Sequence, residues 1–346
     1  MLHVKLTGYS RQYALDLALA HSSSRIAPPR TPWTSIAIHV FVFAVWGLLF
    51  ARAFYLDGMA AWSIGMAYVG YDTLLLAFVA WQARALRWPT RADAEHSVLK
   101  PPSLAVIVAA HNEAAALPVT LHALFGQTHA PDEIIIADDG SSDGTAALLT
   151  ERYGLVQPDE GELSEASTRY PTLRWLRLPH GGKARALNAA LVELHSETFM
   201  TVDADTLLEP DACAAMVRAF ARSPRLVAAT GLLTPVCARN ATGRFFQWFQ
   251  TYEYIRNFVS RFAWARADGL LLVSGAFACY RREAVTDVGG FDPTCLVEDY
   301  ELIHRLRRHA AMRALPPMRR ARCPHSCGSA GAGSRASCKP NTGIAR

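Results

Sequence analysis

The sequence has few cysteines, and they are not spaced in pairs. Its seven cysteines do not form the pattern of a disulfide framework, which favours a reducing compartment over a secreted one. Cys323 and Cys327 could begin a metal-binding knuckle, but neither a second Cys pair nor a His pair completes it. Disulfide-stapled and zinc-knuckle proteins are therefore poor interpretations of this chain.

Charge is also scarce, and acidic residues are missing from the end of the chain. Charged residues make up 19% of the 346, and ten Lys and Arg but no Asp or Glu follow Glu301. The formal net charge of +5 arises at this end, since the rest of the chain has more acids than bases. No basic face with interleaved aromatic residues precedes it, so we expect no nucleic-acid partner.

Two stretches near the N-terminus lack charge almost completely. Residues 35–50 contain no Asp, Glu, Lys or Arg, and residues 58–82 contain only Asp72. A bilayer-spanning helix needs about 20 mostly apolar residues, which predicts transmembrane helices at 32–54 and 58–82. A pair of buried core helices is the alternative. Aromatic residues near the ends favour the membrane; they are Trp33, Tyr55, Trp62 and Trp81.

Basic residues flank this pair of apolar stretches on both outer sides. Between the two stretches the only basic residue is Arg52. By the positive-inside rule, both flanks face the cytosol. A cleaved signal peptide is not expected, because the first apolar run begins only at residue 35. The sequence predicts a multi-pass protein of the cell membrane, with a cytosolic segment 1–31 and a cytosolic domain after residue 82.

The pattern changes between residues 100 and 310 to short apolar runs that alternate with amphipathic segments. This alternation predicts an α/β domain with an open, mostly parallel sheet, which would bind ligands beyond the carboxyl ends of its strands. We expect helices at 113–127 and from about residues 145, 183 and 210. The expected strands are 104–110, 133–139, 173–178, 198–203 and 225–233.

Polar and acidic residues follow three of these strands. A single acidic residue after a strand could be a helix N-cap, as Ser142 or Asp143 could be. Three polar strand ends at one edge of the sheet are harder to explain as caps. Neighbouring carboxylates repel each other unless a positive group stands between them. Because no Cys or His pattern lies among them, these carboxylates suit Mg²⁺ or Mn²⁺, which also take substrate phosphates as ligands. A solvated acidic loop is the alternative interpretation. The residues are His111, Asn112, Glu113, Asp138, Asp139, Asp203 and Asp205.

Six motifs occur in order along this domain: VAAHNEAAAL, IIIADDGSSDGT, HGGKARALNAAL, VDADT, SGAFACYRREAVTDVGGF and LVEDYEL. Together they resemble the family 2 glycosyltransferases with the GT-A (Rossmann-like) fold. The membrane branch, with cellulose, chitin, hyaluronan and poly-N-acetylglucosamine synthases, is the most similar, over residues 100–309 and the preceding apolar stretches. The resemblance implies metal-dependent transfer, with inversion, of a hexosyl or N-acetylhexosaminyl group. The donor would be a nucleotide-sugar, a UDP-sugar, and the acceptor a polysaccharide or lipid at the membrane.

The resemblance also implies which residues bind the donor. Asp205 would hold the metal, with Asp203 completing the DxD motif, and Lys183 would reach the diphosphate from its glycine-flanked loop. The pocket for uridine would be lined by Ala110, Asn112 and Glu113, with Asp138 and Asp139 against the uracil.

The acceptor side is implied by the last two motifs. Ser274 and Gly275 would begin the acceptor surface, which runs to Phe277. Asp299, beside Glu298 in the ED pair, would be the general base, which is needed because the acceptor hydroxyl loses its proton during attack. The metal would stabilise the departing nucleoside diphosphate.

The chain departs from the family pattern in two places. Val297 stands where threonine usually precedes the ED pair, and the Gln-x-x-Arg-Trp motif of processive members is missing. Residues 311–346 form an irregular basic tail, for which disorder is one explanation. Codons compatible with 326–342 also encode a Gln-x-x-Arg-Trp stretch in another frame, so we expect this tail to be out of frame. A product without the motif would lose part of the acceptor site and could be inactive.

Two other functional classes were weighed against this interpretation. A non-catalytic, nucleotide-binding membrane protein would need neither Asp299 nor the GGF segment, and both are present. A nucleotidyltransferase usually has a Gly- and Arg-rich loop after its first strand, where this chain has AAHNEAAAL.

Overall fold

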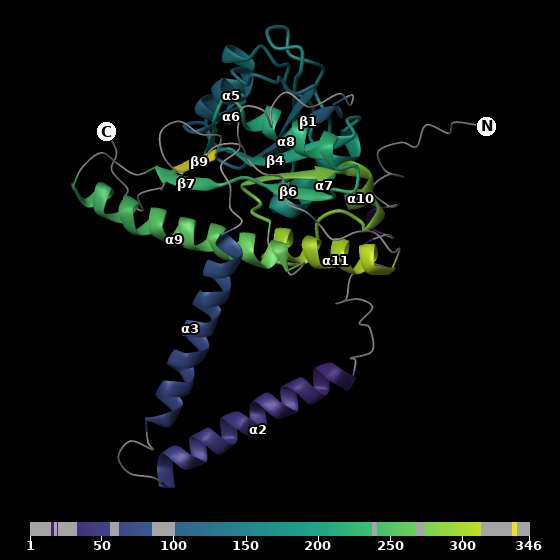
Figure 1. The fold of residues 1–346 in the computed structure, drawn as a ribbon. Helices are drawn as coiled ribbons and strands as arrows, with labels where there is room; N and C mark the ends of the chain where they lie inside the picture. The colour runs from purple at the N-terminus through teal and green to yellow at the C-terminus, as the bar shows by residue number, and fades with distance from the viewer. Residues whose placement is uncertain are drawn as a thin grey trace. The chain divides into compact units, whose positions relative to one another are not determined.

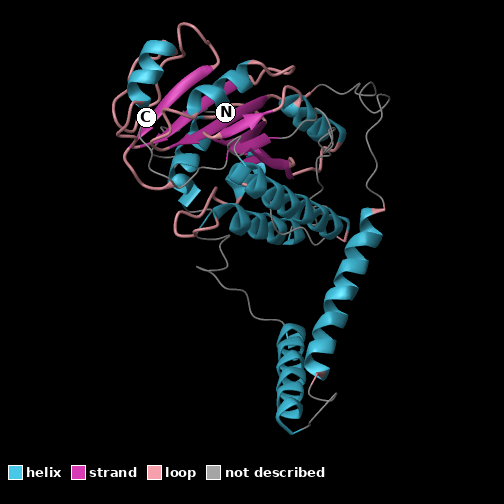
Figure 2. Cartoon of the chain, turned by 90° about the vertical axis from the view of Figure 1, so that its left-hand side faces the viewer, coloured by secondary structure: helices cyan, strands magenta, loops and turns pink. Residues whose placement is uncertain are grey.

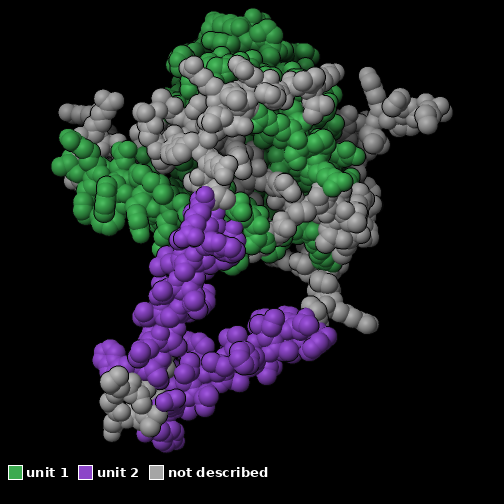
Figure 3. All heavy atoms as spheres, viewed as in Figure 1, with its two compact units in different colours: residues 1–23, 88–346 green, residues 24–87 purple. Residues whose placement is uncertain are grey.

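The chain forms two compact units, which are drawn in different colours in Figure 3. The larger unit comprises residues 1–23 and 88–346, and the smaller one residues 24–87. The computed structural model describes residues 15, 16, 19, 33–55, 62–84, 101–236, 241–267, 273–312 and 334–337.

The smaller unit consists of two helices that contact each other, α2 (Trp33–Tyr55) and α3 (Ser63–Ala83). The stretch Trp33–Arg52 of α2 has a mean hydropathy of 2.1, and none of it is buried inside the structure. Within the described residues it is the one helix that is long and apolar enough to cross a bilayer. The predicted second span at 58–82 is helical from Ser63 onward, but this helix is not apolar enough to count as a candidate span. Asp72 lies near its centre.

Residues from the N-terminus belong to the core of the larger unit. Leu15 and Leu19 are 2% and 9% exposed and pack beside Gly289. A Cβ atom added to Gly289, which has a φ of +87°, would lie 2.1 Å from the backbone N of Leu19. Leu15 and Leu19, which fall in the predicted cytosolic segment 1–31, thus contact the larger unit.

A six-stranded sheet forms the centre of the larger unit, in the order β3-β2-β1-β4-β8-β6 (Figures 1 and 2). The first four strands are parallel neighbours, whereas β8 runs antiparallel to both β4 and β6. This is the mixed, mostly parallel α/β sheet that the sequence predicts. The strands are β1 (Leu104–Ala110), β2 (Glu133–Asp139), β3 (Leu173–Leu178), β4 (Thr198–Asp203), β6 (Ala228–Thr230) and β8 (Phe277–Arg281).

Helices cover both faces of this sheet, and this explains the continuous apolar runs of its central strands. Side chains of β1 alternate between two buried clusters, one on each face. Leu121 of α5 and Phe220 of α8 belong to the first cluster, and Leu187 of α7 and Leu302 of α11 to the second. These helices are α5 (Leu117–Phe125), α7 (Lys183–Glu193), α8 (Ala212–Arg222) and α11 (Glu298–Met312).

Several elements differ from the prediction. Helix α5 begins at Leu117 instead of residue 113, with Pro118 in its first turn, a position that suits proline. The helix expected from residue 145 consists of one α-turn, α6 (Thr145–Ala147), and a π-helical turn, η2 (Leu148–Arg152). The expected strand 225–233 is divided into β6 and the start of β7 (Leu233–Val236). Strand β8 was not predicted, nor were α9 (Ala241–Arg266) and α10 (Arg282–Asp287).

A second, three-stranded sheet has the order β5-β9-β7. Strand β9 (Ser334–Ser337) is antiparallel to β5 (Thr206–Leu208) and parallel to β7. Four residues of the predicted irregular tail are thus extended, because β5 and β7 offer backbone partners on either side. Residues 313–333 and 338–346 lie outside the described residues, and the out-of-frame origin of the tail stays a prediction.

Candidate functional site

The ends of strands β1, β2 and β4 meet at one edge of the sheet, as predicted. In the register of the strands, Ala110 is opposite Asp138, and Ala109 is opposite Asp203. Residues that follow these strands therefore leave the sheet side by side. Ala110 itself is buried, at 3% exposure.

The loops after β1 and β2 are tied together by hydrogen bonds. The backbone N–H of Asn112 donates to Ser141 Oγ at 2.9 Å, and Asn112 Oδ1 accepts from the Ser142 N–H at 2.8 Å. Asn112 has a φ of +56°, a left-handed conformation that asparagine tolerates better than most residues. Glu113 follows it, half-buried. The predicted uridine-pocket residues thus sit on a fixed loop pair.

Asp143 strengthens the same link between the loops. Its carboxylate accepts from the Ala114 N–H at 3.1 Å and from the Thr145 N–H at 3.0 Å. Burial raises the pKa of Asp143, but the hydrogen bonds from Thr145 and Ala114 outweigh this and lower the pKa. Asp143 precedes the N-cap of the short helix that follows, Gly144, so its carboxylate joins the two loops and is not the N-cap expected from the sequence.

Asp138 faces into the protein and not outward. It is 3% exposed, and its carboxylate accepts from the Ser141 N–H at 2.9 Å and from Trp175 Nε1 at 3.2 Å. One carboxylate oxygen thus fixes the turn after β2, and the other fixes the indole of Trp175 on β3. Asp138 thus supports the turn after β2, and its predicted place against the uracil stays a prediction.

Asp139 holds the glycine loop that precedes α7. Its carboxylate accepts from the Gly181 N–H at 2.7 Å and the Gly182 N–H at 3.0 Å, and it lies 3.0 Å from His180 Nδ1. The rings of His111 and His180 are 4.4 Å apart. Ligand atoms of these two histidines and Asp139 lie within 4.8 Å of one another, so the set could hold a metal ion. The sequence did not predict this cluster.

Lys183 and Asp203 form an ion pair at the end of β4. The Lys183 Nζ atom lies 2.5 Å from Asp203 Oδ1. Burial lowers the pKa of Lys183, but Asp203, with Glu298 and Asp299, has the larger combined effect, so the pKa is raised. The positive group expected beside the two aspartates is thus supplied in part by the protein. Asp205 is half-buried next to the pair.

Asp299 lies in the first turn of α11 and contacts the segment before β8. Its Oδ2 accepts from the Gly275 N–H at 2.9 Å, and its Oδ1 accepts from the Tyr300 N–H at 2.8 Å. The Asp203 N–H donates to the Ala276 carbonyl at 3.3 Å. The fold therefore brings together the DxD motif, the Ser274–Gly275 segment and the ED pair, including half-buried Glu298.

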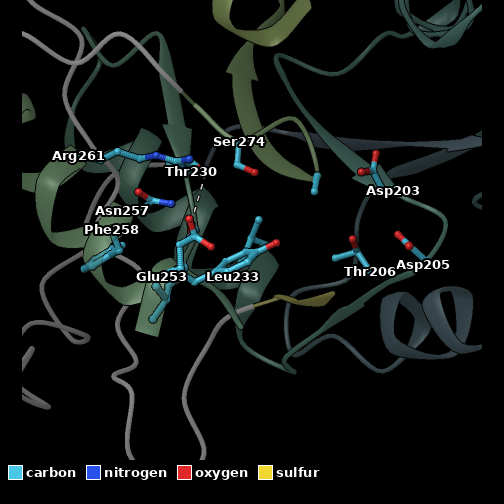
Figure 4. Close-up of a pocket in the computed structure, with 14 residues that line it drawn as sticks. Asp203, Asp205, Thr206, Thr230, Leu233, Glu253, Asn257, Phe258, Arg261 and Ser274 are labelled. Atoms are coloured by element: carbon cyan, nitrogen blue, oxygen red, sulfur yellow. Dashed lines mark hydrogen bonds between the residues drawn. The ribbon is translucent and has the colours of Figure 1, made fainter. Parts of the chain in front are cut away.

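A cavity of about 470 Å³ opens between these motifs and α9 (Figure 4). Asp203, Asp205 and Ser274 line it together with side chains of α9 that the sequence analysis did not identify. These side chains include Glu253, Asn257 and Arg261. Their spacing of four residues along a helix is the signal that could have indicated one face toward a site.

Two buried groups fix the turn that leads to α11. Arg305 is 2% exposed and donates to the carbonyls of Val288 and Gly290 at 2.6 Å each, and it pairs with Glu301 at 2.6 Å. Asn188 of α7 exchanges two hydrogen bonds of 2.7 Å with the backbone of Phe291. The GGF segment thus anchors the helix that carries Asp299.

Comparison with known families identifies the class of this fold and site. Residues 105–289, more than half of the chain, match the model for glycosyl transferase family 2. The chain belongs to glycosyl transferase family 2, as the motifs predicted, and the prediction of an enzyme of this family is confirmed.

Individual relatives agree with this family. The chain is 28% identical over 205 residues to a poly-beta-1,6-N-acetyl-D-glucosamine synthase of Staphylococcus epidermidis, covering 59% of this chain and 45% of that protein. It is 27% identical over 225 residues to the synthase of the same name from Staphylococcus aureus, covering 64% and 50%. The chain spans about half the length of the curated relatives it matches.

A solved structure has a similar fold. It is a mannosyltransferase from Pyrobaculum calidifontis in complex with GDP-Man and Mn²⁺, with a TM-score of 0.50 and 21% identity. The similarity covers 82% of this chain and 69% of that one. The larger unit is thus a GT-A-like α/β fold.

Proposed function

We propose that this chain is the catalytic part of a membrane glycosyltransferase that transfers a sugar from a UDP-sugar to a polysaccharide or lipid acceptor, with inversion. The observation that carries the proposal is that contacts join three motifs beside a cavity which Asp203, Asp205 and Ser274 line. The Lys183–Asp203 pair, Asp205 and the Gly275–Asp299 contact come from distant parts of the chain. The synthases named among the relatives support an N-acetylglucosaminyl group as the sugar.

The donor would bind across the carboxyl ends of the strands. The loops fixed by Asn112, Glu113 and Asp139 would hold the uracil and ribose, with Asp138 supporting them from beneath. Lys183, at the N-terminal end of α7, would place its ammonium group against the diphosphate. A helix N-terminus behind it adds favourable potential for an anion.

The carboxylates of the DxD motif fit a divalent cation. Asp203 and Asp205 both line the cavity and belong to one turn, and hard oxygen ligands of this kind suit Mg²⁺ or Mn²⁺. Asp205, with Asp203, would hold the ion. When bound, such an ion neutralises charge on the departing diphosphate. The cluster of His111, Asp139 and His180 fits this role less well, because the Asp139 carboxylate already accepts two backbone hydrogen bonds.

Asp299 would act as the general base in a single displacement. The acceptor hydroxyl gives its proton to the Asp299 carboxylate while its oxygen bonds to the anomeric carbon. The bond from that carbon to the diphosphate oxygen breaks at the same time. Hydrogen bonds from the Gly275 and Tyr300 N–H groups orient the carboxylate.

The packing of the N-terminus supports a two-helix membrane hairpin. Leu15 and Leu19 are buried in the larger unit, so the chain before α2 and the chain after α3 would lie on one side of a membrane. The number of crossings between them would then be even. If α2 spans the bilayer, α3 would return, and the lack of bases between the two helices favours the cytosol as the shared side.

Replacement of the base tests this proposal. In the full chain, purified in detergent and supplied with UDP-N-acetylglucosamine and Mn²⁺, Asp299→Asn should reduce sugar transfer about 10²- to 10⁴-fold. UDP binding, measured by calorimetry, should stay unchanged. Glu283→Gln, at an exposed acid of α10, serves as the matched control. Transfer by Asp299→Asn within threefold of the parent, at equal expression, would remove Asp299 from the mechanism.

A further inference from the structure

Three segments of the chain meet at the edge of the sheet around His111, Asp139 and His180. His111 follows β1, Asp139 is the last residue of β2, and His180 lies in the loop before α7. One ligand atom from each residue lies within 4.8 Å of the other two. Both histidines are exposed, so an ion can reach them from solvent. The proposed function gives neither imidazole ring a task.

The backbone of Asp139 determines which nitrogen of His111 carries a proton. His111 Nδ1 lies 2.7 Å from the backbone carbonyl oxygen of Asp139, so Nδ1 is protonated and donates to it. The neutral ring then has its lone pair on Nε2, which lies 3.0 Å from the side-chain amide nitrogen of Asn112. A ring that is oriented through one nitrogen and offers the other is the usual arrangement of a histidine metal ligand.

Asp139 and His180 offer the other two ligand atoms. His180 Nδ1 lies 3.0 Å from Asp139 Oδ2. Two ligand atoms at zinc-binding distance from one ion are about 3.0–3.4 Å apart, depending on the angle between them, so one ion fits between this nitrogen and this oxygen. The other carboxylate oxygen, Oδ1, accepts from the Gly181 N–H at 2.7 Å and from the Gly182 N–H at 3.1 Å. These two hydrogen bonds orient the carboxylate from behind, as outer-shell partners do in metal sites.

The chemistry of these ligands indicates the class of ion. The set contains two imidazoles and one carboxylate, and Asp139 is only 6% exposed. Imidazole ligands suit Zn²⁺ and similar late transition metals, whereas Mg²⁺ prefers a shell of oxygen ligands. One carboxylate beside two neutral rings has a charge that attracts a divalent cation. The cluster therefore differs from the DxD motif, whose aspartates offer only oxygen ligands.

We propose that His111, Asp139 and His180 form a second metal site, which takes Zn²⁺ and excludes the nucleotide while the ion is bound. The exclusion rests on the proposed function, in which Asp139 faces the uracil and Lys183 reaches the diphosphate. An ion on Asp139 Oδ2 occupies the place of the base. It also joins the glycine loop to the loop after β1, which holds Lys183 away from an incoming diphosphate. Zinc is then an inhibitor, in contrast to the catalytic cation of the DxD motif.

Zinc binding to the nucleotide-free protein tests the site without relying on turnover. The full chain in detergent, with accessible thiols alkylated and Mg²⁺ in excess, is titrated with Zn²⁺ by calorimetry, and the histidine ring signals are followed by NMR. His111→Ala and His180→Ala should each weaken zinc binding at least about tenfold, because loss of even an outer-shell partner typically costs about 10- to 100-fold. His122→Ala, at an exposed histidine of α5, and Asp205→Asn, in the DxD motif, should bind zinc as the parent does.

A competition arm tests the exclusion of the nucleotide. In excess Mg²⁺, Zn²⁺ at about ten times its own Kd should raise the apparent Kd for UDP about tenfold in the parent and leave it unchanged in His180→Ala. Equal zinc affinity in the parent and both histidine variants, or zinc binding that leaves the His111 and His180 ring signals in place, would overturn the site. A UDP affinity of the parent that ignores Zn²⁺ would overturn the exclusion. The proposed function would fail differently, through absence of UDP binding in Mg²⁺ or Mn²⁺ alone, with the zinc titration intact.

Discussion

The side-chain nitrogen of Lys183, the first residue of α7, lies 2.5 Å from a carboxylate oxygen of Asp203, the last residue of β4. This pair joins the glycine loop to the DxD motif. Under the proposed function, the same ammonium group would leave Asp203 for the diphosphate of the donor. The pair makes both residues part of one electrostatic unit before any ligand is present.

Removal of the ammonium group should weaken nucleotide binding. We expect Lys183→Ala to raise the Kd for UDP about 10- to 100-fold, because a charge-assisted hydrogen bond contributes about 1.5–3 kcal/mol. Calorimetry with Mn²⁺ present measures the change. Arg174→Ala, at an exposed base of β3, is the control and should bind UDP like the parent. Parental affinity in Lys183→Ala would place the diphosphate elsewhere.

UDP binding should depend on a divalent cation. Asp203 and Asp205 would otherwise face the diphosphate as like charges. We expect UDP to bind at least tenfold more weakly in EDTA than in Mn²⁺ or Mg²⁺, in calorimetric titrations at constant ionic strength. Equal affinities in EDTA and in Mn²⁺ would exclude the metal from donor binding.

The buried guanidinium of Arg305 should matter for stability. Arg305→Met would leave the Glu301 carboxylate without its partner and two backbone carbonyls without donors. Breaking a buried ion pair in this way typically costs about 3–5 kcal/mol. Thermal unfolding should show a clearly lower Tm than for the control Arg222→Met, at an exposed residue of α8. A Tm equal to that of the control would show that Arg305 is dispensable.

Asp143 should make stability depend on pH in the acid range. Its folded-state pKa lies below the ordinary value of 3.8, so its contribution is present above that pH and is lost as pH falls through the folded-state pKa. Asp143→Asn should therefore unfold at a lower temperature than the parent at pH 7, and the difference should shrink below about pH 4. A difference that stays constant from pH 7 to pH 3 would contradict this.

The membrane hairpin predicts opposite sides for two positions. Reporter fusions made after residue 57 and after residue 95 should report the outside and the cytosol, respectively. This arrangement follows from the even number of crossings and the positive flanks. If both fusions report the cytosol, α2 and α3 do not cross the membrane.

Local sequence patterns were sufficient to predict the centre of the fold. The runs that became β1 and β2 are apolar throughout because helices bury both of their faces. The polar residues that end them could be placed at one sheet edge by the parallel-strand rule alone. Family motifs assigned Lys183, Asp203, Asp205 and Asp299 to one site, and Lys183 lies 2.5 Å from Asp203.

The parts that sequence did not predict depend on contacts between distant residues. The inward orientation of Asp138 depends on the indole of Trp175, which is on a neighbouring strand and gives no local signal. The break between β6 and β7 falls at Gly231 and Leu232, inside the stretch that the sequence analysis predicted as one strand. The four-residue spacing of polar residues on α9 was a weak local signal, because aromatic residues are distributed all around this helix.

The burial of Leu15 and Leu19 beside Gly289 also sets an order of events during synthesis. Roughly 270 residues separate Leu19 from Gly289, and at about 5–20 residues per second a ribosome needs on the order of half a minute to make them. The contact of Leu19 with Gly289 can therefore form only after most of the chain has been synthesised.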